Sequence, residues 1–180
     1  ALVNVAGVEL EGPFADKQWN GLLALMRVNM EAGIRLMHAL AGMRADREEL
    51  RVINTASLAA FFPMPYKALY AASKAFIMSA SLALREELRG RATITVLCPA
   101  GMPTTPARVE AIDAQGAIGR ITTMNTSEVA RVTYDAAMRG KPVVIPGIIN
   151  RVILAVSRAI PKPILATLIA RRWGSVRGYA

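Results

Sequence analysis

The amino-acid sequence predicts an α/β fold in which helices cover both faces of a parallel sheet. Segments that are apolar or β-branched almost throughout alternate along the chain with longer segments whose apolar residues recur at helical spacing. Strands with so few polar residues are typical of parallel sheets that are buried on both faces. With 180 residues, of which 53% are hydrophobic, the chain is long enough for a substantial core.

The first half of this pattern contains two strands, each followed by a long helix. A strand is predicted over 1–7 (ALVNVAG), and a helix with an apolar stripe is predicted over 15–43. The stripe consists of Leu22, Leu25, Met26, Met30, Ile34, Met37 and Leu40. The second strand, RVINTAS at 51–57, leads into a second long helix over 66–89. This alternation favours strands that run parallel to each other.

The pattern continues after the third strand, ATITVLC at 92–98. A short lid helix is expected over 106–115, and a helix over 126–140 begins with Thr and Ser as candidate N-cap residues and ends at a glycine. The run PVVIPG at 142–147 is the fourth predicted strand. No internal repeat or low-complexity linker interrupts these elements, so we expect 1–147 to belong to a single domain.

The remaining residues, 148–180, form a basic and apolar tail. Six Lys or Arg and no acid occur in it: Arg151, Arg158, Lys162, Arg171, Arg172 and Arg177. The spacing predicts two short amphipathic helices within 148–173, separated by a kink at the PKP sequence of 161–163. Two interpretations remain open. The tail packs against the domain or a partner subunit, or it lies in an anionic membrane interface with Trp173 and the aliphatic residues in lipid.

Composition argues against several kinds of site. The formal net charge is +9, but aromatic residues make up only 6% of the chain, so we expect no nucleic-acid partner. One cysteine, Cys98, and one histidine, His38, cannot form a disulfide or a Cys/His zinc cluster, so no metal site is predicted. No run reaches the ~20 apolar residues of a spanning helix, and no signal peptide is visible. A cytoplasmic location is therefore predicted, with membrane association through the tail as the alternative.

The helix predicted over 66–89 carries a tyrosine and a lysine four positions apart, Tyr70 and Lys74. Residues at this spacing lie on one helix face within reach of each other. A phenol with an unperturbed pKa near ~10 transfers protons poorly at neutral pH, but a nearby cation favours the phenolate and lowers that pKa. The pair can therefore serve as an acid/base centre, although a surface tyrosine that packs along a lysine stem would have the same spacing.

Several motifs together carry a resemblance to a known family. They are NVAG at 4–7, Asn29, Ser57, YAASK at 70–74 and VLCPAGMPTT at 96–105. With these motifs in register, the chain resembles the second half of a short-chain dehydrogenase/reductase, which implies a Rossmann-like, doubly wound parallel sheet. The Gly-rich phosphate-binding turn of such sheets does not occur in the sequence. We therefore expect the sheet to be incomplete in its N-terminal half, and further residues to precede Ala1 in the protein.

The resemblance implies an NAD(P)-dependent oxidoreductase that interconverts a carbonyl and an alcohol. Tyr70 would act as general acid/base, and Ser57 would donate a hydrogen bond to the carbonyl oxygen. Lys74 would hold the nicotinamide ribose and, with the positive charge of the oxidised cofactor, lower the pKa of Tyr70. Asn29 would complete a proton relay through water, with a satisfied buried amide as the alternative reading of that residue.

A second group of residues is implied on the cofactor side of the site. It consists of Asn4, Ala6, Gly7, Pro99, Gly101 and Thr104, together with Tyr70 and Lys74. Ala100 splits the Pro-Gly pair of the family motif, so either Thr104 or Thr105 could be the cofactor-side threonine. In NVAG at 4–7, Val5 replaces the second Asn of the Asn-Asn-Ala-Gly motif of the family. The residue that selects between NAD and NADP belongs after a strand that this sequence does not contain, so the cofactor is NAD or NADP.

Substrate and assembly are predicted only coarsely. The small and apolar residues of 102–125, where the family has a mobile loop, suit a lipophilic carbonyl or alcohol. Tyr66 is a candidate for lining the substrate cleft. By the resemblance, the helices over 15–43 and 66–89 pair across a two-fold axis, which predicts a homodimer or homotetramer. A catalytically silent scaffold or membrane-surface protein of the same shape is the alternative, and the intact catalytic set speaks against it.

Overall fold

The computed structural model describes residues 1–42 and 49–178, except the side chains of 176 and 177. Its four strands form one sheet in the order β1-β2-β3-β4, and all neighbours are parallel. The strands are β1 (Leu2–Asn4), β2 (Leu50–Thr55), β3 (Ala92–Leu97) and β4 (Val143–Val144). The predicted parallel α/β sheet is confirmed. Its strands lie within one residue of their predicted ranges and are shorter than predicted.

The first helical segment is a continuous run with an irregular centre. It consists of α1 (Trp19–Met26), a π-helical turn η2 (Arg27–Glu31) and α2 (Ala32–Gly42), and the short 3-10 turn η1 (Phe14–Asp16) precedes it. In η2 the Ala32 N–H bonds to the Arg27 carbonyl, five residues back. The uniform helix predicted over 15–43 is thus wrong at its start and at its centre, and position 43 lies outside the described residues.

The second long helix, α3 (Ala68–Glu87), starts two residues later than predicted. Tyr66 has φ of 65°, and Lys67 has φ of −133° and ψ of 27°, so neither residue is helical. A positive φ is rare for a bulky residue, and it marks a backbone held by its surroundings. The carbonyl of Tyr66 accepts a 2.9 Å hydrogen bond from the Gly12 N–H, which ties this turn to the loop after β1.

Three helices follow β3, namely α4 (Pro106–Asp113), α5 (Gly116–Thr122) and α6 (Thr126–Met138). The hydroxyl of Thr105 caps α4. The N-cap residue of α6 is Asn125, whereas the following Thr and Ser were the predicted N-cap candidates for this helix. The sequence analysis missed α5, because the segment is short and packs through a glycine. A Cβ at Gly119 would lie 2.2 Å from the Ile112 carbonyl oxygen, so only glycine allows α5 to approach α4 this closely.

The tail contains the two predicted helices, α7 (Ile148–Ser157) and α8 (Lys162–Arg177). They are separated before Lys162 by Pro161, which is the N-cap residue of α8. Asn150 and Leu154 of α7 are buried. Within 1–42 and 49–178, no helix is both long and apolar enough to cross a membrane.

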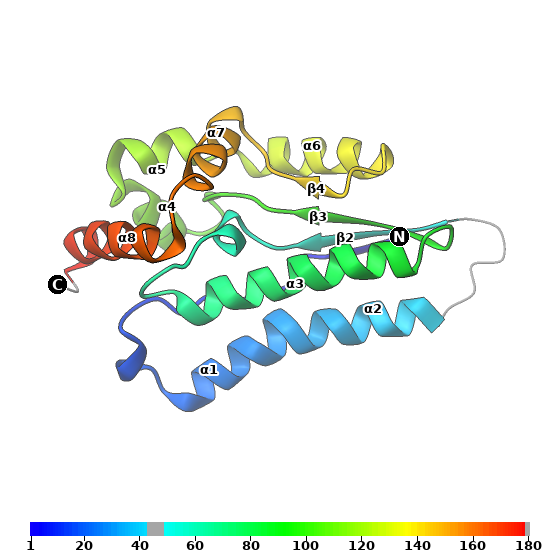
Figure 1. The fold of residues 1–180 in the computed structure, drawn as a ribbon, viewed down its shortest axis with the longest axis horizontal. Coiled ribbons are helices and arrows are strands. Elements are labelled where there is room, and N and C mark those ends of the chain that lie inside the picture. The colour runs from blue at the N-terminus through cyan, green and yellow to red at the C-terminus, as the bar shows by residue number, and fades with distance from the viewer. Residues whose placement is uncertain (43–48, 179–180) are drawn as a thin grey trace.

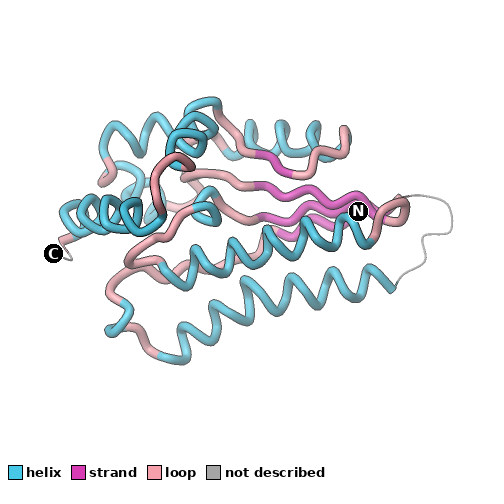
Figure 2. Tube along the Cα trace, in the orientation of Figure 1, coloured by secondary structure: helices cyan, strands magenta, loops and turns pink. Residues whose placement is uncertain are grey.

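The helices form layers on both sides of the sheet (Figure 1). α1, α2 and α3 lie on one side, and α6 lies on the other. The strands run toward the end of the molecule where α4, α5 and α8 are found, as the tube in Figure 2 also shows. The carboxyl ends of the strands therefore meet at that end, which is where ligands bind in open α/β sheets.

Candidate active site

Four predicted catalytic residues come from segments that adjoin the carboxyl ends of β1 and β2. Ser57 follows β2, Tyr70 and Lys74 belong to the first turns of α3, and Asn29 lies in the π turn η2. The hydrogen bonds and contacts described below connect all four. The structure therefore brings together residues that are up to 45 positions apart in the sequence.

Lys74 is buried, with 5% of its surface exposed. Its ammonium donates a 3.0 Å hydrogen bond to the carbonyl oxygen of Thr55, the last residue of β2. The Nζ atom lies 5.9 Å from the centre of the Tyr70 ring. Burial lowers the pKa of Lys74, while the nearby Cys98 and Glu9 act in the opposite direction. The lysine is thus fixed between the end of β2 and the tyrosine ring.

The pKa of Tyr70 is raised, whereas Lys74 together with the positive charge of the oxidised cofactor was expected to lower it. Burial of the phenol is the main cause, because the charged phenolate is poorly solvated there. A hydrogen bond with the Ser57 side chain lowers the pKa, the charge of Glu9 raises it and the charge of Arg108 lowers it. Burial, Glu9 and Arg108 therefore control the protonation of Tyr70. Neither Glu9 nor Arg108 was predicted from the sequence to belong to the site.

Ser57 is held by the backbone around it. It is the N-cap residue of the 3-10 turn η3 (Leu58–Phe61), and its Oγ accepts a 3.1 Å hydrogen bond from the Ala59 N–H. Its own backbone bonds to the thiol of Cys98. Burial raises the pKa of Cys98 to about 12, so this thiol stays protonated and serves packing. His38 is exposed on α2.

Asn29 is buried in the π turn, and both atoms of its amide have protein partners. Its Oδ1 accepts a 2.8 Å hydrogen bond from the Val8 N–H, and its Nδ2 donates to the Val8 carbonyl at 2.9 Å and to the Ser73 Oγ at 3.0 Å. Ser73 donates in turn to the Tyr70 carbonyl at 2.7 Å. A chain of hydrogen bonds thus connects the loop after β1 to the Tyr70 backbone, and Asn29 matches the alternative of a satisfied buried amide.

The loop after β1 leaves space beside the lysine. A Cβ added at Gly7 would lie 2.9 Å from the Lys74 Nζ and 3.5 Å from the Asn29 Oδ1. Glycine therefore keeps open a concave position that faces both catalytic side chains. Ala6 and Gly7 are exposed. A side chain at position 7 would therefore collide with Lys74, so glycine leaves the lysine accessible from this loop.

The other predicted cofactor-side residues are less closely grouped. Asn4 is the last residue of β1, and its Nδ2 donates a 3.4 Å hydrogen bond to the Oδ1 of the fully buried Asn54 on the neighbouring strand β2. The carbonyl of Pro99 accepts a 2.8 Å hydrogen bond from the Leu58 N–H, which joins the loop after β3 to η3. Gly101 and Thr104 are exposed. The Thr105 hydroxyl accepts a hydrogen bond from the Arg108 N–H and so caps α4. Of the two candidate threonines, Thr104 is therefore the one without a capping role.

The sequence analysis missed a group of charged residues close to Tyr70. Glu9 pairs with both Lys67 and Arg108, and Glu11 pairs with Lys67 and accepts a hydrogen bond from the Trp173 indole. Members of these pairs are up to 162 positions apart in the sequence, so no periodicity could connect them. In the described residues, no group of His, Cys, Asp and Glu could hold a metal ion.

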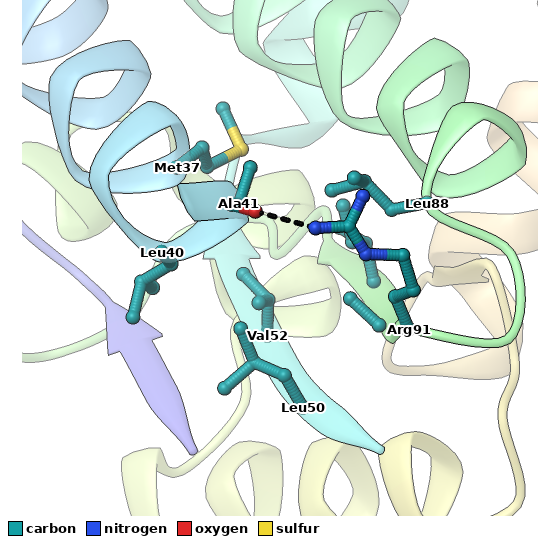
Figure 3. Close-up of a pocket in the computed structure, with 9 residues that line it drawn as sticks. Met37, Leu40, Ala41, Leu50, Val52, Leu88 and Arg91 are labelled. Atoms are coloured by element: carbon teal, nitrogen blue, oxygen red, sulfur yellow. Dashed lines mark hydrogen bonds between the residues drawn. The ribbon is translucent and has the colours of Figure 1, made fainter. Parts of the chain in front are cut away.

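Two cavities lie outside this cluster. One is a pocket of about 20 Å³ at the amino ends of β2 and β3, where the Arg91 guanidinium donates to the Ala41 carbonyl (Figure 3). It has room for about one water molecule and is at the opposite end of the sheet from Tyr70. The other is an apolar groove of about 460 Å³ between residues 60–65, the start of α3 and α8.

Comparison with known proteins agrees with this arrangement. The sequence pattern of the short chain dehydrogenase family matches residues 1–115. The ketoacyl reductase HetN of Nostoc sp. is 32% identical over 110 residues, which are 61% of this chain and 38% of that protein. The chain thus spans less than half of that relative's length.

Two solved structures are similar in fold. A 7beta-hydroxysteroid dehydrogenase structure has a TM-score of 0.78 at 21% identity and covers 94% of this chain and 67% of its own. A short chain dehydrogenase/reductase from Burkholderia phymatum, solved in complex with NAD, has a TM-score of 0.74 at 21% identity and covers 88% and 65%. With the family pattern matched over more than half of its residues, the chain belongs to the short-chain dehydrogenase/reductase family.

Proposed function

We propose that this protein is an NAD(P)-dependent oxidoreductase that interconverts a carbonyl and an alcohol. The observation that carries the proposal is the convergence of Tyr70, Lys74 and Ser57 beside the concave position at Gly7. In this proposal, 1–147 are the C-terminal portion of the catalytic domain and 148–180 are a tail.

Each member of the cluster has a distinct proposed role. Tyr70 donates its phenolic proton to the substrate oxygen during reduction and accepts it during oxidation. Ser57, already hydrogen bonded to the phenol, donates to the same substrate oxygen where negative charge develops. Lys74 binds the ribose hydroxyls, and Asn29 completes the proton path through water. The nicotinamide, when bound, supplies or accepts the hydride.

The cofactor is proposed to lie along the loops at the carboxyl end of the sheet. Ala6, Gly7, Gly101 and Thr104 would contact it, because these residues are exposed there. Asn4 and Pro99 would act indirectly, since their hydrogen bonds fix β1 and the loop after β3. A member of the family with bound NAD has the same fold, which supports a nicotinamide cofactor, either NAD or NADP.

The substrate is proposed to be lipophilic. The groove between residues 60–65, α3 and α8 starts three residues after Ser57 and is lined almost entirely by Ala, Phe, Pro and Met side chains. An apolar wall of this size suits an aliphatic or ring substrate that carries few polar groups. The relative in Nostoc is named a ketoacyl reductase, which is consistent with such a substrate.

The direct test is cofactor oxidation by the complete gene product. Purified protein is mixed with NADH or NADPH and a panel of aliphatic ketones, ketoacyl thioesters and steroid ketones, and absorbance is followed. Oxidation that depends on an added ketone supports the proposal. If neither cofactor binds and no ketone is reduced, the protein is not this enzyme and the silent-scaffold alternative stands.

We expect the protein to form a homodimer or homotetramer through α1, α2 and α3. These helices form the outer layer on one side of the sheet (Figure 1), and the Phe76 side chain of α3 is 39% exposed. Phe76→Glu should shift sedimentation at micromolar concentration toward the monomer, because the interface would bury an unpaired charge. Tyr134→Glu, on α6, is the matched control and should leave the assembly unchanged. A parent protein that sediments as a monomer would disprove this assembly.

We also propose that α7 contacts an anionic membrane surface. Ile148, Val152 and Val156, spaced four residues apart, are each more than half exposed, and no acid follows Asp135 in the chain. Trp173, expected in lipid under this interpretation, instead packs over Lys67 at 4.7 Å and bonds to Glu11. The contact is therefore assigned to α7, with Arg151 facing the lipid phosphates.

The membrane contact predicts binding that depends on both lipid charge and the apolar face of α7. The protein should co-sediment with phosphatidylcholine vesicles that contain phosphatidylglycerol, and much less with phosphatidylcholine alone. The double variant Val152→Glu/Val156→Glu should remain in the supernatant. Equal recovery of the parent protein in the supernatant with both kinds of vesicle would remove the membrane proposal and leave α7 as a packing element.

A further inference from the structure

A buried network of ion pairs lies beside Tyr70 and uses none of the proposed catalytic residues. Glu9, in the loop after β1, has a side chain that is only 11% exposed. One of its carboxylate oxygens pairs with the Lys67 ammonium, and the other accepts a 2.6 Å hydrogen bond from Arg108 of α4. Lys67 is 9% exposed and directly precedes α3. Glu9 thus joins α4 to the start of the helix that carries Tyr70.

The network continues from Lys67 to the tail. The Lys67 ammonium pairs with Glu11 at 2.9 Å and lies 4.7 Å from the centre of the Trp173 ring of α8. The Trp173 indole donates to Glu11 at 3.2 Å. The strained backbone of Tyr66 adjoins Lys67, which indicates that the surrounding contacts hold this turn in place. Four separate segments of the chain therefore meet at two partly buried carboxylates.

Isolated buried charges are costly, so a network of this kind needs a reason. A carboxylate with two cationic partners is stable, and the pKa of Glu9 is accordingly lowered by Arg108 and Lys67, against the effect of burial. The formal charges of Glu9, Glu11, Lys67 and Arg108 cancel. Both carboxylates thus have cationic partners within the chain, which favours a positioning role over an anion-binding role.

We propose that Glu9 is a positioning residue that holds α4 closed against the start of α3 and sets the balance of charge beside the Tyr70 hydroxyl. The catalytic consequence of this arrangement rests on the proposed function, but the contact and the charge balance do not. Glu9 and Arg108 form one ion pair, yet they act on Tyr70 in opposite directions.

The groups that face Tyr70 come from every element packed around it. Glu9 belongs to the loop after β1, Ser57 to the end of β2, Arg108 to α4 and Lys74 to α3 itself. The negative charge of Glu9 disfavours the phenolate and raises the pKa of Tyr70, so removal of that charge lowers the pKa. The positive charge of Arg108 favours the phenolate, so its removal raises the pKa of Tyr70.

Two variants of the full chain test this inference without an activity assay. Glu9→Gln keeps the shape of the side chain, and Arg108→Met keeps the stem of a side chain that is 43% exposed. Glu86→Gln and Arg89→Met are the matched controls, because these residues form an exposed ion pair at the far end of α3. The first readout is amide hydrogen exchange of residues 107–113, the α4 residues that follow Pro106. The second is the titration of Tyr70 by NMR of ¹³C-labelled tyrosine, assigned with Tyr70→Phe.

Both site variants should exchange the α4 amides roughly tenfold faster than the parent, because a charge-assisted hydrogen bond is lost. The Tyr70 titration midpoint should move down in Glu9→Gln and up in Arg108→Met, and neither control should change either readout. Unchanged exchange in α4, or midpoints that move in the same direction, would overturn the inference. If Glu9→Gln does not fold, Arg108→Met alone decides, since faster exchange together with a raised midpoint is still required.

Discussion

Replacing Tyr70 by phenylalanine is expected to reduce turnover by ~10²–10⁴-fold, the usual loss when an enzyme is deprived of its general acid/base. The ring remains, so its packing in the buried site and its 5.9 Å distance to the Lys74 ammonium are preserved. Only the hydroxyl and its hydrogen bond with Ser57 are removed. The loss should therefore appear mainly in kcat, and the Michaelis constant for the ketone should change little.

The measurement compares steady-state rates of the purified parent and variant with the ketone that the parent reduces fastest. Tyr134→Phe is the matched control, because Tyr134 is exposed on α6 and its hydroxyl is distant from the site. Urea unfolding of both variants checks that the fold is intact. If Tyr70→Phe turns over as fast as the parent, then Tyr70 is not the acid/base and the proposed mechanism is wrong.

The parts of the molecule that the sequence predicts well depend on local spacing. Tyr70 and Lys74 are four residues apart in one helix, so their proximity follows once α3 is recognised. The strands β2 and β3 are long enough, and apolar enough, for their parallel pairing to follow from composition. The π turn at Asn29 could not be found this way, because an insertion of one residue barely disturbs an apolar stripe of helical period.

The charge network shows what local spacing cannot predict. Glu9 and Arg108 are 99 positions apart in the sequence. Judged from their sequence neighbours alone, both would be expected to be ordinary surface charges. Only the tertiary structure places them in contact. The unexpected start of α3 has the same origin, since the positive φ of Tyr66 depends on contacts from the distant loop around Gly12. Tertiary contacts here override the helical preference of the segment.

The raised pKa of Tyr70 could not be predicted from the sequence for a related reason. The sequence shows that a lysine is one helical turn away, but it does not show how deeply the phenol is buried. Burial proves to be the larger influence, and the Lys74 ammonium is directed to the Thr55 carbonyl. A neighbouring cation is therefore a guide to the pKa of a tyrosine only when the depth of burial is known.

Replacing Asn29 by alanine is expected to lower the free energy of unfolding by about 2–4 kcal/mol, because three buried or partly buried hydrogen bonds are lost together. The Val8 N–H and carbonyl would lose their partner, and so would the Ser73 hydroxyl, which supports the Tyr70 backbone. Turnover should also fall, since the loop that carries Gly7 is no longer held against α3.

Urea unfolding gives the stability change, and an unchanged denaturant slope would confirm that the folded and unfolded states are comparable. Asn20→Ala is the matched control, because Asn20 is exposed on α1 of the same helical run, and its loss should change stability by no more than about 0.5 kcal/mol. A change of that same small size for Asn29→Ala would mean that water or a shifted backbone replaces the amide. In that case the π turn would not depend on Asn29, and the side chain would be retained for the proton path alone.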